Sequence, residues 1–113
     1  MSEARLKSEI WVKAQLRQCD VNLMPAVITR RGDADAGQVL VKVIRARADC
    51  DLLAQRYGDD GQRAWTVVAQ GLESDCDAYI VREADVDPDL WVVEIEDPKD
   101  RYRPDGQEPL RPA

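Results

Sequence analysis

The chain has 113 residues, of which 44% are hydrophobic and 34% are charged, and its formal net charge is -6. This length and composition are typical of one folded domain with a single modest core, and they argue against a disordered chain. No apolar stretch approaches the roughly 20 residues that span a bilayer, and residues 1–5 lack the features of a signal peptide. We therefore expect a cytoplasmic protein that contacts no membrane.

The first predicted element is a helix over residues 7–19. Its apolar residues recur every three or four positions and form one stripe suited to packing on a sheet. Ser8 or Ser2 is expected to cap the N-terminus of this helix. Pro25 ends the connection that follows, and a strand is predicted over residues 26–30.

A polar loop over residues 30–37 separates this strand from a second one, predicted over residues 38–46. The loop contains glycines and aspartates, which tolerate the positive φ angles of tight turns, and β-branched residues flank it on both sides. The pattern therefore predicts a β-hairpin. Its loop carries the one compact polar cluster in the N-terminal half of the sequence.

Two further strands are predicted over residues 52–57 and 64–69, with a tight turn at residues 58–61 between them. The simplest arrangement of these four strands is a meander. A second helix follows, because Ser74 and Asp77 have the spacing of a capping box. Pro88 ends this helix by about Val86.

The last predicted strand covers residues 90–96, and its nearly continuous apolar start indicates an interior position in the sheet. The predicted order is α-β-β-β-β-α-β, an α+β domain over residues 1–97. Its sheet is expected to be mostly antiparallel, with both helices packed on one face. Residues 98–113 contain four prolines, many charges and one large aliphatic residue, so we expect a disordered tail.

The cysteines are three in number and widely spaced: Cys19, Cys50 and Cys76. A disulfide framework needs an even and dense set, and a zinc site needs closely spaced pairs. The chain has no histidine, which is the usual partner of a catalytic cysteine. We expect three buried free thiols, no metal and no cofactor.

One acidic pattern resembles a calcium-binding loop. Asp85, Asp87, Asp89 and Glu96 occupy positions 1, 3, 5 and 12 of that pattern. Leu90 stands where the sharp turn requires glycine, and a strand over residues 90–96 would carry the glutamate away from the aspartates. The sequence therefore predicts no calcium site.

The first candidate site is the polar cluster of the predicted hairpin, which consists of Arg30, Arg31, Asp33 and Asp35. Its arginines either pair with the two aspartates or are free to bind a carboxylate or phosphate through two parallel hydrogen bonds. Turn chemistry alone also favours small residues and aspartates at these positions.

The second candidate site is aromatic, because the chain contains three tryptophans and no phenylalanine. Trp11 and Trp91 lie among apolar residues of the first helix and the last strand, and Trp65 lies in the fourth strand. Core packing explains such residues, and so does a partner-binding groove. We retain Trp11 and Trp91 as candidate partner-binding residues.

Charge is distributed unevenly along the chain. Residues 1–47 hold nine basic and five acidic residues, whereas residues 48–113 hold seven and seventeen. Such asymmetry favours an acidic partner or head-to-tail self-association, unless folding interleaves the two halves. Five arginines of the first half are the candidates for nucleic-acid binding, which the acidic net charge makes the least favoured function: Arg17, Arg30, Arg31, Arg45 and Arg47.

Three separated segments resemble a family of small alphaproteobacterial proteins that is described only as a domain of unknown function. They read RLKSEIWVKA (residues 5–14), RGDADAG (residues 31–37) and DPDLWVVE (residues 87–94). The resemblance covers residues 5–97. It implies a bacterial single-domain protein without an assigned activity, and it supplies no catalytic or binding residues.

The function is therefore unknown from the sequence, and three hypotheses remain. The first is a non-catalytic protein-binding or regulatory module, whose partner is another protein or a second copy of itself in a homodimer. This hypothesis rests on the three tryptophans and the charge asymmetry. The alternative is a small enzyme or a domain that binds an anionic ligand through the loop over residues 30–37. The third is nucleic-acid binding through the five arginines.

Overall fold

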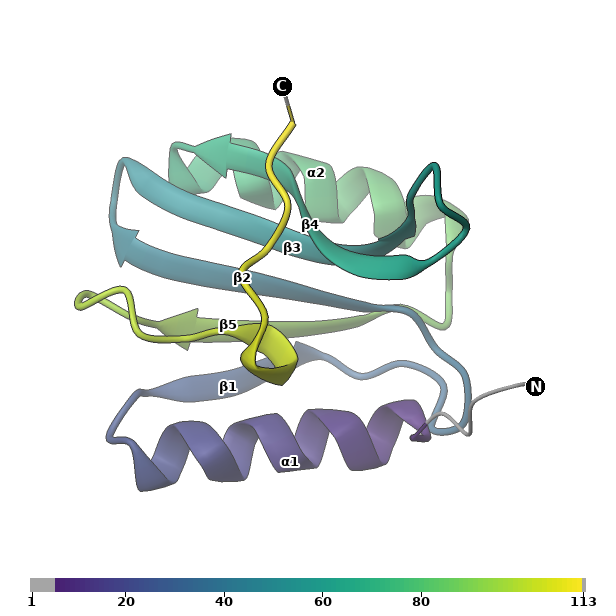
Figure 1. The fold of residues 1–113 in the computed structure, drawn as a ribbon, viewed down its shortest axis with the longest axis horizontal. Coiled ribbons are helices and arrows are strands. Elements are labelled where there is room, and N and C mark those ends of the chain that lie inside the picture. The colour runs from purple at the N-terminus through teal and green to yellow at the C-terminus, as the bar shows by residue number, and fades with distance from the viewer. Residues whose placement is uncertain (1–5, 113) are drawn as a thin grey trace.

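The computed structural model describes residues 6–112, which form two α-helices, five strands and one short 3-10 helix (Figure 1). In chain order these are α1 (Ser8–Val21), β1 (Ala26–Arg30), β2 (Val39–Ala46), β3 (Asp49–Tyr57), β4 (Arg63–Gly71), α2 (Glu73–Val86), β5 (Trp91–Glu96) and η1 (Pro104–Gly106). The predicted α+β class and the predicted order of elements are confirmed. None of the described helices is long and apolar enough to cross a membrane.

All five strands form one sheet in the order β1-β5-β2-β3-β4. β5 pairs antiparallel with β1 and parallel with β2, and the other neighbours are antiparallel. The predicted interior position of the last strand is therefore confirmed. The predicted hairpin over residues 30–37 is wrong, because β5 lies between β1 and β2. β5 is buried on both faces, as β2 and β3 are, so it takes an interior place in the sheet and separates the two strands that are adjacent in sequence.

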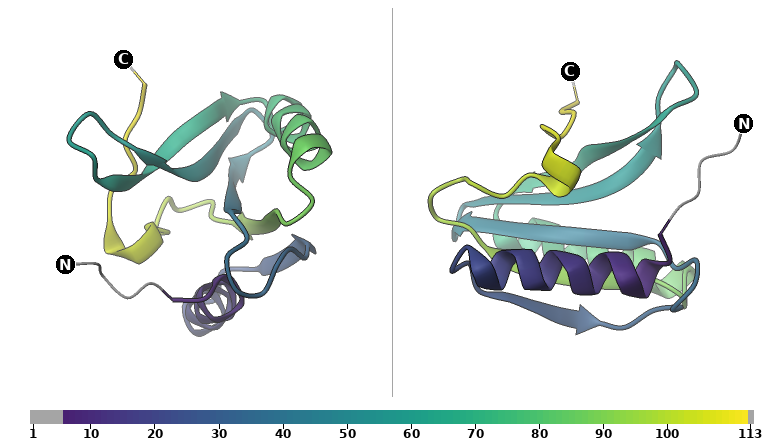
Figure 2. Two further views of the ribbon diagram at one scale, coloured as in Figure 1. Left: turned by 90° about the vertical axis from the view of Figure 1, so that its right-hand side faces the viewer. Right: turned by 60° about the horizontal axis from the view of Figure 1, so that its bottom comes forward.

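The two helices cover opposite faces of the sheet, as the left view of Figure 2 shows. Val12 of α1 packs in one core with Val41 and Val93, and Cys76 of α2 packs in the other core with Leu40 and Val92. The prediction that both helices pack on one face is wrong. Successive residues of β2 and β5 are apolar on both sides of the sheet, and each side needs its own cover.

Residues 98–112, for which the sequence predicts a disordered tail, lie against the α1 face of the sheet. Tyr102 is buried in the core of that face, and its hydroxyl donates a hydrogen bond to Gln15 Oε1 at 2.8 Å. Pro104 is also buried, and Leu110 forms hydrogen bonds with the outer edge of β4. One aromatic anchor and a set of hydrogen bonds thus order a segment that is poor in aliphatic residues.

The α2 face contains one buried cation, Lys42. Its ammonium group lies 2.6 Å from a carboxylate oxygen of Asp77, 2.8 Å from one of Glu73 and 3.9 Å from one of Glu94. Burial alone would lower the pKa of Lys42, but the carboxylates that accept its hydrogen bonds outweigh burial and raise this pKa. The cluster ties the N-terminal turn of α2 to β2.

Candidate functional site

The loop over residues 31–37 closes the N-terminal end of α1. The backbone N–H of Ser8 donates to the carbonyl of Asp35 at 3.3 Å, and that of Glu9 donates to the carbonyl of Ala34 at 3.0 Å. These carbonyls satisfy donors that the first turn of a helix leaves free. No side chain caps α1, and the Ser8 hydroxyl donates instead to the carbonyl of Gly37, so the predicted Ser8 cap is wrong. Ser2, the other predicted cap, lies outside the described residues, as does residue 5 of the first family-like segment.

The same loop also lies against the start of β5. The Asp33 N–H donates to the carbonyl of Asp89 at 3.0 Å, and the Trp91 indole N–H donates to the carbonyl of Asp33 at 2.7 Å. A Cβ atom on Gly32 would lie 2.0 Å from the Asp89 carbonyl oxygen, so the close approach requires glycine. The three family-like segments of the sequence therefore meet at one end of the sheet.

Four of the six candidate residues contribute to this junction. Arg30 donates to two carbonyls of the segment before β5, at 2.6 and 3.2 Å. Arg31 lies over the ring of Trp91, 5.9 Å from its centroid, and Trp91 is only 1% exposed. The carboxylate of Asp33 accepts the backbone N–H groups of Asp35 and Ala36. These contacts hold the loop in place.

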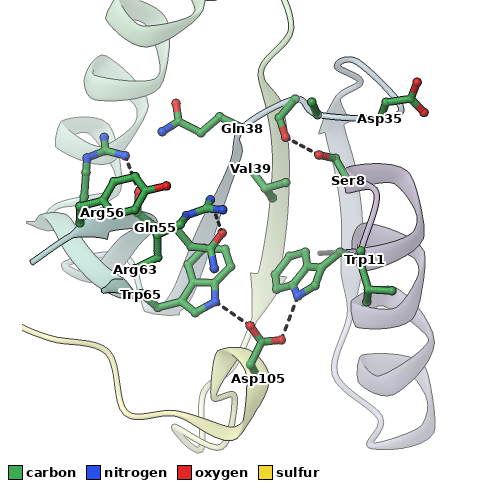
Figure 3. Close-up of a pocket in the computed structure, with 14 residues that line it drawn as sticks. Ser8, Trp11, Asp35, Gln38, Val39, Gln55, Arg56, Arg63, Trp65 and Asp105 are labelled. Atoms are coloured by element: carbon green, nitrogen blue, oxygen red, sulfur yellow. Dashed lines mark hydrogen bonds between the residues drawn. The ribbon is translucent and has the colours of Figure 1, made fainter. Parts of the chain in front are cut away.

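The other two candidate residues, Trp11 and Asp35, line an open cleft of about 710 Å³ (Figure 3). We call it the tryptophan cleft. It lies on the α1 face, between the N-terminal turn of α1, the loop before β2 and the adjoining ends of β3 and β4. Its lining includes Trp65 from β4, and Asp105 of η1 also contributes to it.

The wall of the tryptophan cleft is a pair of stacked indoles. The ring centroids of Trp11 and Trp65 are 5.0 Å apart, and the ring planes make an angle of 25°. Both indole N–H groups donate to the carboxylate of Asp105, at 2.9 and 3.0 Å. Asp105 has a φ angle of 52°, a left-handed conformation that aspartate tolerates better than most residues. One carboxylate from the C-terminal segment thus fixes both rings (Figure 3).

Across the cleft from Ser8, Arg63 presents a guanidinium group. One of its N–H groups donates to Gln55 Oε1 at 2.6 Å, and the guanidinium lies 5.8 Å from the ring centroid of Tyr57. Tyr57 is 71% exposed, so this cation and ring stand at the mouth of the cleft. The lining therefore combines aromatic surface, amide groups and two arginines, Arg56 and Arg63.

Comparison with known proteins places the chain in a family. Residues 6–103 match the family described as protein of unknown function DUF1491. The chain belongs to the DUF1491 family. This confirms the resemblance that the three segments indicate, and no function is attached to the family. No curated protein matches the chain.

Three solved structures resemble this DUF1491 chain. A crystal structure of a DUF1491 protein from Caulobacter crescentus is 42% identical with a TM-score of 0.79, over 94% of this chain and 99% of that one. An NMR structure of a DUF1491 protein from Caulobacter crescentus is 39% identical with a TM-score of 0.79, over 96% and 98% of the two chains. A solution structure of a protein from A. tumefaciens is 27% identical with a TM-score of 0.75, over 95% and 99%.

In this DUF1491 protein the arginines named for nucleic-acid binding are partly engaged. Arg45 forms ion pairs with Asp49 at 3.0 Å, Asp51 at 2.8 Å and Asp100 at 3.6 Å. Arg30 donates to backbone carbonyls, as described above. These two side chains serve the fold of the domain.

Sequence reasoning missed Arg63, Gln55 and Asp105 of the DUF1491 cleft. Arg63 and Gln55 belong to neighbouring strands, and only their pairing brings the side chains together. A signal for the third residue was present, because the residues Pro104, Asp105 and Gly106 have the composition of a tight turn. The many charges and prolines around them pointed to disorder instead.

Proposed function

We propose that this DUF1491 protein is a non-catalytic binding module that receives a short segment of a partner protein in the tryptophan cleft. The observation that carries the proposal is an open cleft of about 710 Å³ with a wall of two stacked indoles. Ligand sites in proteins commonly have volumes of roughly 300–1,000 Å³. Tryptophan and arginine are also enriched among the residues that dominate protein interfaces.

The polar groups of the lining support a peptide ligand. Gln38, Gln55 and Ser8 place amide and hydroxyl groups around the aromatic wall. Amides both donate and accept hydrogen bonds, so they suit the backbone of an extended segment. Asp105 holds the two indoles in place before any ligand arrives, and such preorganisation lowers the entropic cost of binding.

We also propose that the protein works in a bacterial cytoplasm. Its structural relatives come from Caulobacter crescentus and A. tumefaciens. All three cysteines are free thiols buried in the fold, which suits a reducing compartment.

A selection from a random-peptide display library on the folded protein tests the binding proposal. The tightest peptides are then added to ¹⁵N-labelled protein, and the three indole N–H signals are followed. We expect the Trp11 and Trp65 signals to shift. The Trp91 signal is expected to stay in place, because the Trp91 side chain is buried outside the cleft. A failure to select any peptide, or shifts confined to residues outside the cleft, would refute the proposal.

A blocked cleft provides the matched control. Ala36 is an exposed residue of the lining, so Ala36→Trp places a bulky side chain at the mouth. Ala78 is exposed on α2, on the other face of the sheet, and Ala78→Trp adds the same surface there. The first variant is expected to weaken peptide binding at least tenfold, and the second to leave it unchanged.

A further inference from the structure

We infer that the segment which the tryptophan cleft receives is acidic, and that one of its carboxylates binds the guanidinium of Arg63. This inference rests on the proposed function, because it specifies the chemistry of the same site. It concerns which partner the cleft selects, and it is carried by how the charged groups of the lining are already engaged.

Arg63 differs from three other arginines of the α1 face. Arg45, Arg103 and Arg111 each form at least one ion pair with a carboxylate. Arg56, which also contributes to the lining, lies 3.6 Å from Glu83 of α2. Within residues 6–112, Arg63 is bonded to the neutral amide of Gln55 and to no carboxylate. Its charge is therefore available to a ligand.

The geometry of Arg63 is fixed before a ligand binds. The bond to Gln55 Oε1 occupies one N–H of the guanidinium, and the guanidinium carbon lies over the ring of Tyr57, 5.8 Å from its centroid. An arginine held in this way keeps further N–H groups in a planar fork that matches the two oxygens of a carboxylate. Figure 3 shows Arg63 and Gln55 side by side above the Trp65 ring.

The two carboxylates of the lining do not satisfy this arginine. Asp105 accepts both indole N–H groups, and Asp35 lies 3.6 Å from the ammonium group of Lys7. A ligand carboxylate at Arg63 would therefore supply a missing opposite charge, whereas a basic ligand would meet a cation. Charge complementarity of this kind contributes mainly to specificity between partners.

The aromatic surface beside Arg63 adds a second requirement. The half-buried Trp11 and Val39, together with Trp65, which is 3% exposed, form the apolar part of the lining next to the guanidinium. An acidic residue that enters the cleft is thus expected to have an apolar neighbour in the peptide sequence, which buries its side chain against the indoles.

The test uses the peptides selected on the folded protein. Their sequences are compared with those selected on Arg63→Gln under the same conditions. We expect aspartate or glutamate to be enriched beside an apolar residue on the native protein, and the acidic enrichment to disappear on the variant. Peptides without acidic enrichment that still shift the Trp11 and Trp65 signals would overturn this inference and leave the proposed function standing. Failure to select any peptide would overturn both.

Affinity measurements then test the contact itself. The acidic peptide and its Glu→Gln or Asp→Asn counterpart are titrated by fluorescence anisotropy. Arg63→Gln is expected to lower the affinity for the acidic peptide by about tenfold or more, because a hydrogen-bonded charge pair is lost. The affinity for the neutral counterpart is expected to stay unchanged. Arg63→Lys retains the charge and loses the planar pair of N–H donors, so it is expected to lower the affinity for the acidic peptide by a smaller factor.

Arg82→Gln is the matched control. Arg82 of α2 also lies over a tyrosine ring, at 5.7 Å from the centroid of Tyr79, but on the opposite face of the sheet. This variant is expected to bind the acidic peptide as the native protein does. Equal affinity of native protein and Arg63→Gln for the acidic peptide, with both proteins folded by circular dichroism, would refute the inference.

Discussion

Replacing Asp105 tests how firmly the C-terminal segment holds the cleft together. Asp105→Ala removes an acceptor for two indole N–H groups at 2.9 and 3.0 Å. Hydrogen bonds to a charged group contribute about 1.5–3 kcal/mol each, and the low end applies here because Asp105 is exposed. We therefore expect the variant to lose about 3 kcal/mol of the free energy of unfolding. Asp105→Asn keeps one acceptor oxygen and the tolerance for a positive φ angle, so it is expected to lose about half as much.

The measurement is urea unfolding followed by tryptophan fluorescence, with thermal unfolding as a second readout. A loss of 3 kcal/mol corresponds to a decrease in Tm of roughly 10 °C for a domain of this size. Asp59→Ala is the control, because Asp59 is exposed in the β3–β4 turn and forms no hydrogen bond or ion pair within residues 6–112. If Asp105→Ala and Asp59→Ala unfold at the same urea concentration, the indole contacts do not stabilise the domain and the reasoning fails.

Three further outcomes follow from buried or tightly packed groups. Gly32→Ala is expected to lower the free energy of unfolding by more than about 2 kcal/mol, because its Cβ would overlap a backbone oxygen. Gly61→Ala has free space but a φ of 76°, so it is expected to lower the same quantity by about 1 kcal/mol. Equal losses in urea unfolding would contradict this reasoning. Tyr102→Phe leaves the buried Gln15 oxygen without a partner and should cost about 1–2 kcal/mol. Burial raises the pKa of Tyr102 in the folded protein above the value of about 10 that tyrosine has in the unfolded chain. The protonated hydroxyl therefore stabilises the fold fully below about pH 10, and this contribution is lost as the pH rises further. Above that pH the free energy of unfolding of Tyr102→Phe should fall less steeply than that of the native protein. Burial also raises the pKa of Cys76 to about 11, so mass spectrometry should find this thiol alkylated by iodoacetamide at pH 8 only after urea is added.

The positions of β1, β2 and β5 are predicted correctly from the sequence because local conformational preference and tertiary structure agree there. β1 occupies the predicted residues, and β2 and β5 each begin within one residue of the prediction. Their β-branched residues fit a pleated, half-buried surface, and the surrounding glycines and prolines end them. The predicted interior position of β5 followed from the same residues.

The hairpin failed because adjacency in sequence is only a preference. A loop of glycines and aspartates is compatible with a tight turn, and it is equally compatible with a crossing over the end of another strand. Trp91 and Val92 of β5 are buried on opposite faces of the sheet. A strand that is buried on both faces lies in the interior of a sheet, with a paired strand at each of its edges, so this burial favours the crossing. The candidate site changed accordingly: Arg30, Arg31 and Asp33 became part of a junction, while Trp11 and Asp35 reached the cleft.

By itself, the sequence determined which segments are helices and strands, that they form an α+β domain, and that its thiols are buried, because these properties follow from periodicity and composition within short windows. Only the tertiary structure decided which face each helix covers, where β5 inserts, and that residues from α1, β4 and η1 meet at two indoles and one carboxylate. Such contacts join residues that are up to 94 positions apart, and their formation depends on the packing of the whole chain and not on local preference.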